Sequence, residues 1–163
     1  KQKGIYHFLE IAEIFPNINF YVYSKVPKNI KLEFQRKNPQ NVILAGFSKP
    51  KQIYKNLDAI IFPSRYGEGL ARVILEALAS GTFVISTSIP GNLDLVNKFD
   101  MKMNLVPVIS SIKNYRLAVE NLLGLKPCEL SSILLSNKKN STRLSVQEIA
   151  KVYKLVREDL IGK

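Results

Sequence analysis

Residues 59–85 carry the most informative stretch of the chain and read AIIFPSRYGEGLARVILEALASGTFVI. Two short apolar runs, Ala59–Phe62 and Phe83–Ile85, enclose a glycine-containing loop and an apolar segment that ends at Gly81. This order predicts a strand, a loop, a helix and a second strand, with Glu68 in the loop. A glycine loop lets backbone N–H groups approach a ligand, and a helix N-terminus favours negative charge. The stretch therefore predicts a site for a phosphate or a sugar phosphate.

Two glutamates, Glu68 and Glu76, stand eight positions apart in this stretch. On one continuous helix, eight residues at about 100° each would leave the two side chains roughly 80° apart. The spacing therefore fits Glu68 in the loop and Glu76 within the helix, off its core-facing stripe. The alternative for Glu76 is an exposed ion pair with Arg72, worth only a few tenths of a kcal/mol. The stripe itself is expected to comprise five apolar residues: Leu70, Val73, Ile74, Ala77 and Leu78.

The rest of the chain alternates short apolar runs with helical patterns. Strands are expected at Asn19–Tyr23, Val42–Ala45, Asp58–Phe62, Thr82–Thr87 and Leu105–Ile109. Helices are expected within 5–15, 27–37, 50–57, 93–96, 112–123, 127–136 and 145–160, with a turn at Pro90–Asn92 and a polar loop at Asn137–Asn140. This alternation predicts an α/β fold: a Rossmann-like parallel sheet of about five to six strands with helices on both faces. Because such domains usually begin with a strand, we expect a leading strand to be absent from the front of this sequence.

Composition and charge narrow the class of protein. The 163 residues, 46% of them hydrophobic and 23% charged, fit one globular domain, and no apolar run reaches the roughly 18 residues that span a bilayer. Lys and Arg number 24 against 13 acids, a net charge of +11 that favours an anionic partner only weakly because the charges are dispersed. The single cysteine, Cys128, excludes an internal disulfide, suits a reducing compartment and is expected to be buried or half-buried.

Three blocks of the sequence carry a resemblance to a known family. They are Pro63-Ser64 with Glu68-Gly69-Leu70, then Leu75-Glu76-Ala77-Leu78-Ala79-Ser80-Gly81, and then Val84-Ile85. Together they resemble the Glu-x7-Glu signature, with its flanks, of the retaining GT-B glycosyltransferases of family 4. The resemblance extends over nearly the whole chain, because Lys3-Gly4 before the first helix and Gly46 after the second strand are also similar to that family. The turn Pro90–Asp94 is similar too, although Pro90 and Asp94 stand where the family has glycine and glutamate.

The resemblance implies that residues 1–163 form one nucleotide-sugar-binding domain, the C-terminal half of a GT-B fold. The donor-binding residues that it implies are Lys3, Gly46, Phe47, Gly67, Glu68, Gly69, Leu70, Ala71 and Glu76. Lys3 would contact the diphosphate, Glu68 would have the catalytic role beside the donor sugar, and Glu76 would accept hydrogen bonds from the ribose. Phe47 would pack near the base. Blander roles stay open: Glu68 could serve only the helix dipole, and Lys3 could be solvated.

No metal or cofactor is implied, because a lysine and a helix N-terminus can stabilise a leaving diphosphate. The family's diphosphate-binding arginine and its N-terminal, acceptor-binding domain lie outside these residues. We therefore expect the isolated domain to be inactive, although the resemblance implies an enzyme of the hexosyltransferase type.

The implied reaction transfers a sugar from a UDP- or GDP-sugar, with retention, in the synthesis of cell-surface polysaccharide or glycolipid. Its partners would be the N-terminal domain, a lipid-linked or saccharide acceptor and an anionic membrane surface, which places the protein in the cytoplasm or at the inner membrane face. One alternative is a fragment of a GT-B sugar-nucleotide epimerase, which would need a different acid and histidine set than the single His7 allows. The other is a basic α/β module that binds nucleic acid, for which no motif is present.

Overall fold

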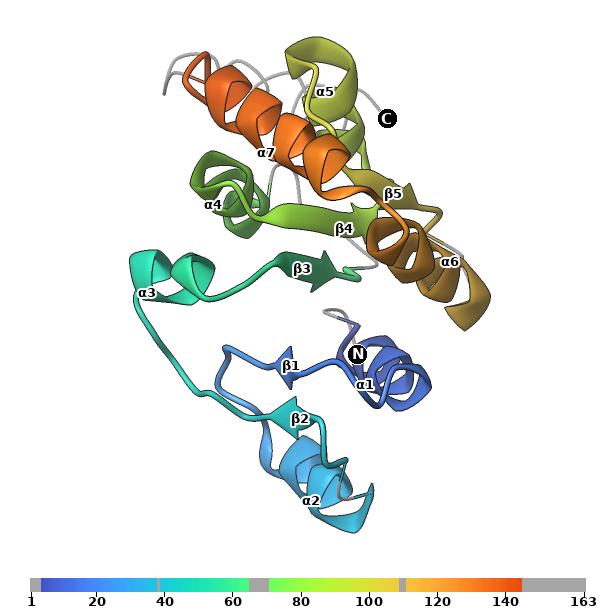
Figure 1. The fold of residues 1–163 in the computed structure, drawn as a ribbon. Helices are drawn as coiled ribbons and strands as arrows, with labels where there is room; N and C mark the ends of the chain where they lie inside the picture. The colour runs from blue at the N-terminus through green and yellow to red at the C-terminus, as the bar shows by residue number, and fades with distance from the viewer. Residues whose placement is uncertain (1–3, 38, 65–70, 109–110, 145–163) are drawn as a thin grey trace, which may run out of the picture.

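The computed structural model describes residues 4–37, 39–64, 71–108 and 111–144 (Figure 1). Its helices are α1 (Ile5–Ile14), α2 (Lys28–Lys37), α3 (Pro50–Lys55), α4 (Arg72–Ser80), α5 (Pro90–Phe99), α6 (Ile112–Leu123) and α7 (Pro127–Ser141). Its strands are β1 (Phe20–Tyr21), β2 (Val42–Ile43), β3 (Ala59–Phe62), β4 (Phe83–Thr87) and β5 (Asn104–Val106). None of the helices in these ranges is long and apolar enough to cross a membrane.

The strands form two parallel sheets instead of the single sheet that the sequence predicts. β1 pairs with β2, and β3, β4 and β5 pair in that order, with Ala59 opposite Phe83 and Ile85 opposite Asn104. Figure 1 shows the smaller sheet below the larger one, with α1 at their right. Every residue of β4 is buried, whereas every residue of β3 is half-buried. β3 therefore has the burial of an edge strand, because among the described strands it has a neighbour on one side only. The α/β class and the parallel pairing are confirmed. The expectation that a leading strand is absent from the front of the sequence stays a prediction.

Side chains of the larger sheet alternate between two apolar clusters, as the twofold period of a strand requires. Phe83 and Ile85 pack on one face with Tyr115 of α6 and Ile11 of α1. Val84 packs on the other face with α4 and α5. Helices therefore cover both faces of β4, as predicted.

Phe20 of β1 packs in the cluster of Phe83 and Ile85, so the two sheets share part of the core. A further cluster beside α2 buries Leu9, Val22, Ile30 and Phe34. Asn41 joins this part to α1, since its amide nitrogen lies 2.9, 3.0 and 3.1 Å from the carbonyl oxygens of Ala12, Phe15 and Ile18. Ala12 lies in the last turn of α1, and Phe15 and Ile18 follow it, where intrahelical donors run out. Asn41 thus fixes the passage from α1 into β1.

Four expectations about local structure are wrong. The predicted turn at Pro90–Asn92 is the first turn of α5, in which Pro90 occupies a position that needs no N–H donor. Val73, predicted to face the core, is 43% exposed because α4 turns Ile74, Ala77 and Leu78 inward. Cys128 is exposed, since it lies at the start of α7.

The fourth error is the polar loop predicted at Asn137–Asn140, which lies inside α7. Asn137 is fully buried there, and its amide accepts from Lys102 N–H at 2.7 Å and donates to Lys102 C=O at 2.7 Å. A run of polar residues usually indicates a loop, but this asparagine pairs like a strand backbone with the segment before β5. Strands β1, β2 and β5 are also shorter than predicted. The helix predicted at 145–160 lies outside the described residues.

Candidate functional site

Four of the nine predicted donor-binding residues lie within the described structure: Gly46, Phe47, Ala71 and Glu76. The other five, Lys3, Gly67, Glu68, Gly69 and Leu70, lie outside the described residues. The local geometry of the site therefore comes from β3 and α4, which flank the loop in sequence, and from the end of β2.

Glu76 lies in the second turn of α4, where its side chain is 23% exposed. One carboxylate oxygen, Oε1, accepts from Arg72 Nε at 2.8 Å, and the other, Oε2, accepts from the Tyr54 hydroxyl at 3.2 Å. The ion pair with Arg72 is thus present, but it is half of a larger arrangement. Glu76 is a half-buried carboxylate with one donor on each oxygen.

Tyr54 reaches Glu76 from α3, and its residue is only 8% exposed. Its hydroxyl also lies 3.1 Å from the carbonyl oxygen of Val73. Burial raises the pKa of the Tyr54 phenol, and the negative charge and hydrogen bond of Glu76 raise it further, while Arg72 lowers it. The phenol therefore stays protonated at neutral pH and acts as a donor.

The N-terminus of α4 begins at Ala71, which has extended backbone angles and makes no side-chain cap. Ser, Thr, Asp or Asn at such a position would accept from the first N–H groups of the helix, and alanine has no oxygen to do so. Ile74 N–H donates to Ala71 C=O at 2.9 Å, whereas Ala71 offers no acceptor to the N–H groups of Arg72 and Val73. N–H groups of this kind are what an anion site at a helix N-terminus requires.

Polar side chains brace the end of β3, from which the donor loop departs. Ser86 Oγ donates to Phe62 C=O at 3.0 Å, and Thr87 Oγ1 donates to Ser64 C=O at 2.6 Å. Asn92, which is fully buried in α5, donates to Ser86 Oγ and to Thr87 C=O at 2.8 Å each. These bonds fix the carboxyl ends of β3 and β4 against each other.

Gly4 packs directly against the same strand end. Its φ is +66°, and a Cβ built on it would lie 2.2 Å from the carbonyl oxygen of Pro63. Only glycine allows both this backbone conformation and this approach. The residue after Lys3 and the residues before the 65–70 loop therefore meet, as a shared site for Lys3 and Glu68 would require.

Gly46 and Phe47 line a groove of about 850 Å³ beyond the end of β2. Gly46 has a φ of +74°, and a Cβ there would meet no atom within 4 Å, so the backbone faces open space. Phe47 is 91% exposed, and Lys25, Lys28 and Lys31 line the same groove. A groove of this volume matches the size of small-molecule sites, and its lysines favour an anionic ligand.

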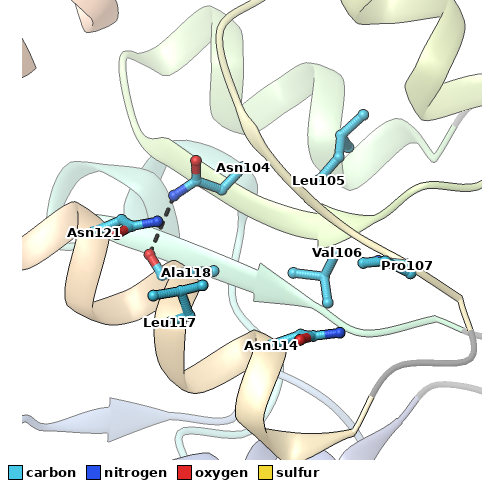
Figure 2. A pocket seen from close by; sticks show the side chains of 8 residues that line it. All are labelled: Asn104, Leu105, Val106, Pro107, Asn114, Leu117, Ala118 and Asn121. Carbon is cyan, nitrogen blue, oxygen red and sulfur yellow. Dashed lines mark hydrogen bonds between the residues drawn. The ribbon is translucent and has the colours of Figure 1, made fainter.

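A second pocket, of about 260 Å³, lies between β5 and α6 (Figure 2). Three asparagines and Leu117 line it, and Figure 2 shows the Asn104 amide turned toward the carbonyl oxygen of Ala118, 3.1 Å away. It contains none of the predicted donor-binding residues and is smaller than typical ligand sites. It is therefore distinct from the candidate site.

The described residues contain no group of three or more acidic, histidine or cysteine side chains that could hold a metal ion. The site residues that the sequence did not reveal are Tyr54 and Asn92. Tyr54 lies 22 positions before Glu76, a separation that no helix or strand period relates. The only sequence signal for Tyr54 is that it is a polar aromatic residue within a short helix, α3.

Residues 1–140 match the family described as glycosyl transferases group 1. The chain is 35% identical over 97 residues to the processive diacylglycerol alpha-glucosyltransferase of Acholeplasma laidlawii, covering 55% of this chain and 29% of that protein. It is 29% identical over 105 residues to the capsular polysaccharide biosynthesis glycosyltransferase CapM of Staphylococcus aureus, covering 59% and 27%.

Among solved structures, a variant of TarM from S. aureus, in complex with fondaparinux, alpha-GlcNAc-glycerol and UDP, superposes with a TM-score of 0.76. The identity is 20%, and the match covers 94% of this chain and 32% of the TarM chain. This likeness shows the fold, which is the predicted C-terminal half of a GT-B architecture. In each comparison the chain spans less than a third of the length of the protein that it matches.

Proposed function

The chain belongs to the glycosyl transferases group 1 family, and from this premise we propose that it binds the nucleotide-sugar donor of a retaining hexosyltransferase. The donor is a UDP- or GDP-sugar. An N-terminal GT-B domain binds the acceptor and forms the opposite wall of the cleft. The isolated 163 residues hold the donor without completing the transfer.

The arrangement of Glu76 carries this proposal. A carboxylate offers about four lone-pair sites, and Tyr54 and Arg72 occupy one on each oxygen. Counting only donors from the described residues, one site on each oxygen remains for a ligand, and the Glu76 side chain is 23% exposed. Two adjacent hydroxyl groups, such as those of a ribose, are donors that fit this pair of acceptors.

The surrounding residues supply complementary chemistry for the rest of a nucleotide sugar. The uncapped N-terminus of α4 suits the diphosphate, and the groove at Gly46 and Phe47 suits the base. We assign Lys3 to the diphosphate and Glu68 to the donor sugar. The contact of Gly4 with Pro63 supports this assignment, because it brings their sequence neighbours together.

Transfer with retention follows the family pattern. The acceptor hydroxyl attacks the anomeric carbon on the face from which the diphosphate departs, the bond to the diphosphate oxygen breaks, and that oxygen takes the hydroxyl proton. The role of this chain is to stabilise the negative charge of the departing diphosphate. N–H groups fixed at a helix N-terminus, and a lysine, do this without reorienting during the reaction.

The pathway is the synthesis of cell-surface polysaccharide or glycolipid. The names of the A. laidlawii and S. aureus relatives place those proteins in glycolipid and capsular polysaccharide synthesis. The net charge of +11 suits work beside anionic lipid headgroups, where each basic residue near the surface contributes about 1 kcal/mol. We therefore propose a cytoplasmic protein peripheral to the inner membrane face.

Calorimetric titration of the chain with UDP, GDP and their sugars tests the proposal. We expect binding of one nucleotide, and a loss of about tenfold in affinity for Glu76→Ala, since a hydrogen bond to a charged group contributes about 1.5–3 kcal/mol. Glu120→Ala is the matched control, because Glu120 has the same i−4 ion pair, with Arg116 at 2.7 Å, on α6. Absence of binding at millimolar nucleotide would refute the donor role. Salt-sensitive binding of oligonucleotides that UDP and GDP do not displace would favour a nucleic-acid module instead.

A further inference from the structure

We propose that Tyr54 is a positioning residue, which holds the Glu76 carboxylate at the orientation required by two adjacent ribose hydroxyls. The inference rests on the proposed function, because it assumes that Glu76 binds the ribose of a nucleotide. It goes further in naming a residue of α3 that selects ribonucleotides without touching them.

The two donors to Glu76 differ in how firmly the protein holds them. The Arg72 side chain is 86% exposed, and a long exposed side chain gains little from a single ion pair. Tyr54 is 8% exposed, and its ring packs in the cluster that contains Ile74 and Leu78 of α4. Its hydroxyl is therefore fixed relative to α4, whereas the guanidinium can leave.

A second contact fixes the height of the Tyr54 hydroxyl along the helix. The hydroxyl lies 3.1 Å from Val73 C=O and 3.2 Å from Glu76 Oε2, so one proton is shared between two acceptors one turn apart. The backbone carbonyl cannot move with a side-chain rotamer. It keeps the phenol in place, and the ionised carboxylate, as the stronger acceptor, is drawn to that fixed proton.

The backbone of Tyr54 is also tied to the sheet, since Thr82 Oγ1, which is buried, lies 3.4 Å from Tyr54 C=O. Thr82 directly precedes β4, the central strand of the larger sheet. The path from β4 to Tyr54 and on to Glu76 thus consists of buried groups. A rigid support of this kind is what holds a binding side chain in its productive geometry.

With Oε2 held by Tyr54, the carboxylate plane is set and each oxygen presents its remaining lone pair in a fixed direction. A pair of hydroxyls can then be bound together, whereas a sugar that lacks them leaves the remaining lone pair of each oxygen without a donor in a half-buried place. Leaving such groups unpaired is the main source of discrimination between a hydroxyl and its absence. Tyr54 is therefore expected to determine the preference for ribose over deoxyribose.

The test combines a change in the protein with a change in the ligand. Affinities for UDP and for 2′,3′-dideoxy-UDP are measured with the wild-type chain and with Tyr54→Phe, and with the guanosine pair if GDP binds more tightly. We expect the wild type to prefer the ribose form by about tenfold or more, and Tyr54→Phe to reduce that ratio at least about threefold. Affinity for the dideoxy form should change less than twofold, because a positioning role acts only through the hydroxyls.

Tyr115→Phe is the matched control, since Tyr115 is also a buried tyrosine and lies on α6, in the cluster of the opposite face. It should leave the ratio unchanged. An unchanged ratio in Tyr54→Phe, with preference intact in the wild type, overturns the inference and leaves the proposed function standing. Equal affinity of the wild type for both nucleotides overturns the inference and the assignment of Glu76 to the ribose, whereas absence of nucleotide binding overturns the proposed donor role itself.

Arg72→Ala keeps the inference falsifiable if Tyr54→Phe does not fold. Because Tyr54 remains in this variant, most of the preference for the ribose form should persist. Loss of the whole preference in Arg72→Ala would identify the exposed guanidinium as the group that positions Glu76, and the inference would be wrong.

Discussion

The hydroxyl of Tyr54 lies 3.2 Å from Oε2 of Glu76, and this bond joins α3 to α4 beside the candidate ribose site. The two residues are 22 positions apart in the sequence. The bond places an uncharged donor, which cannot be screened away by salt, on one side of a half-buried carboxylate. It makes the stability of the fold and the shape of the site depend on the same proton.

This shared proton predicts a loss of stability at alkaline pH. Burial and Glu76 raise the pKa of Tyr54 in the folded chain above its ordinary value of 10.0. Above pH 10 the unfolded phenol loses its proton while the folded one keeps it, so the unfolded state binds fewer protons and unfolding becomes easier as pH rises. Between pH 9 and pH 11 the wild type should lose up to about 1.4 kcal/mol more unfolding free energy than Tyr54→Phe. Urea denaturation at the two pH values measures this difference, and equal losses would contradict it.

The approach of Gly4 to Pro63 predicts that Gly4→Ala is strongly destabilising. The φ of +66° disfavours alanine, and the new Cβ would lie 2.2 Å from the Pro63 carbonyl oxygen, so the backbone must shift. Gly81→Ala is the matched control, because Gly81 has a φ of +77° with no atom within 4 Å of an added Cβ. We expect a cost of about 1 kcal/mol for Gly81→Ala and more than about 3 kcal/mol for Gly4→Ala, by chemical denaturation. Similar costs would mean that the contact with Pro63 is relaxed at little expense.

Removal of the Asn137 amide should cost more than its polar sequence surroundings indicate. Asn137→Ala empties a fully buried side-chain position and leaves the part-buried N–H and C=O groups of Lys102 without their 2.7 Å bonds, at a cost of about 2–4 kcal/mol. Asn140→Ala removes one exposed bond, to Asp100 C=O at 3.0 Å, and should cost less than about 1 kcal/mol. Melting temperatures of the two variants give the comparison. A smaller effect at Asn137 than at Asn140 would argue against the buried pairing.

Arg72→Ala should have little effect on stability, because the ion pair with Glu76 has an 86% exposed partner. Exposed i,i+4 pairs contribute about 0.3–0.5 kcal/mol, and Arg116→Ala, which breaks the similar pair on α6, should behave alike. Denaturation at low and at 1 M salt measures both, since screening should remove what little difference exists. An effect above about 1 kcal/mol at Arg72 alone would indicate that the guanidinium has additional partners.

The parts of the fold that were predictable are those with a local signal. The helix that ends at Gly81 follows from its apolar stripe and from a glycine that adopts a φ of +77°. The position of β4 follows from four residues of high strand propensity among its five, and its full burial fits a central parallel strand. For the same reason Glu76 could be placed on α4, off the buried stripe.

What the sequence did not reveal depends on contacts between distant segments. In the sequence Asn137 resembles a loop residue, and its bonds to Lys102 depend on how α7 packs. Tyr54 resembles an ordinary helical residue, and its bond to Glu76 depends on the packing of α3 against α4. The division of the sheet was equally hidden, because the strand pattern of Phe20–Tyr21 and Val42–Ile43 says nothing about which strands are neighbours. Propensity describes elements, and tertiary packing decides their partners.

A nucleotide bound as proposed would link the two sheets. Phe47 lies in the groove beyond the end of β2, whereas Glu76 lies on α4, which packs against β4. A nucleotide with its base at Phe47 and its ribose at Glu76 would contact both sheets, and separating the sheets would first require its release. Amide hydrogens of residues 18–37 and 39–47 would then exchange more slowly in proportion to nucleotide concentration, while those of β4 would barely change. The substrate would thus complete the tertiary structure of the domain that binds it.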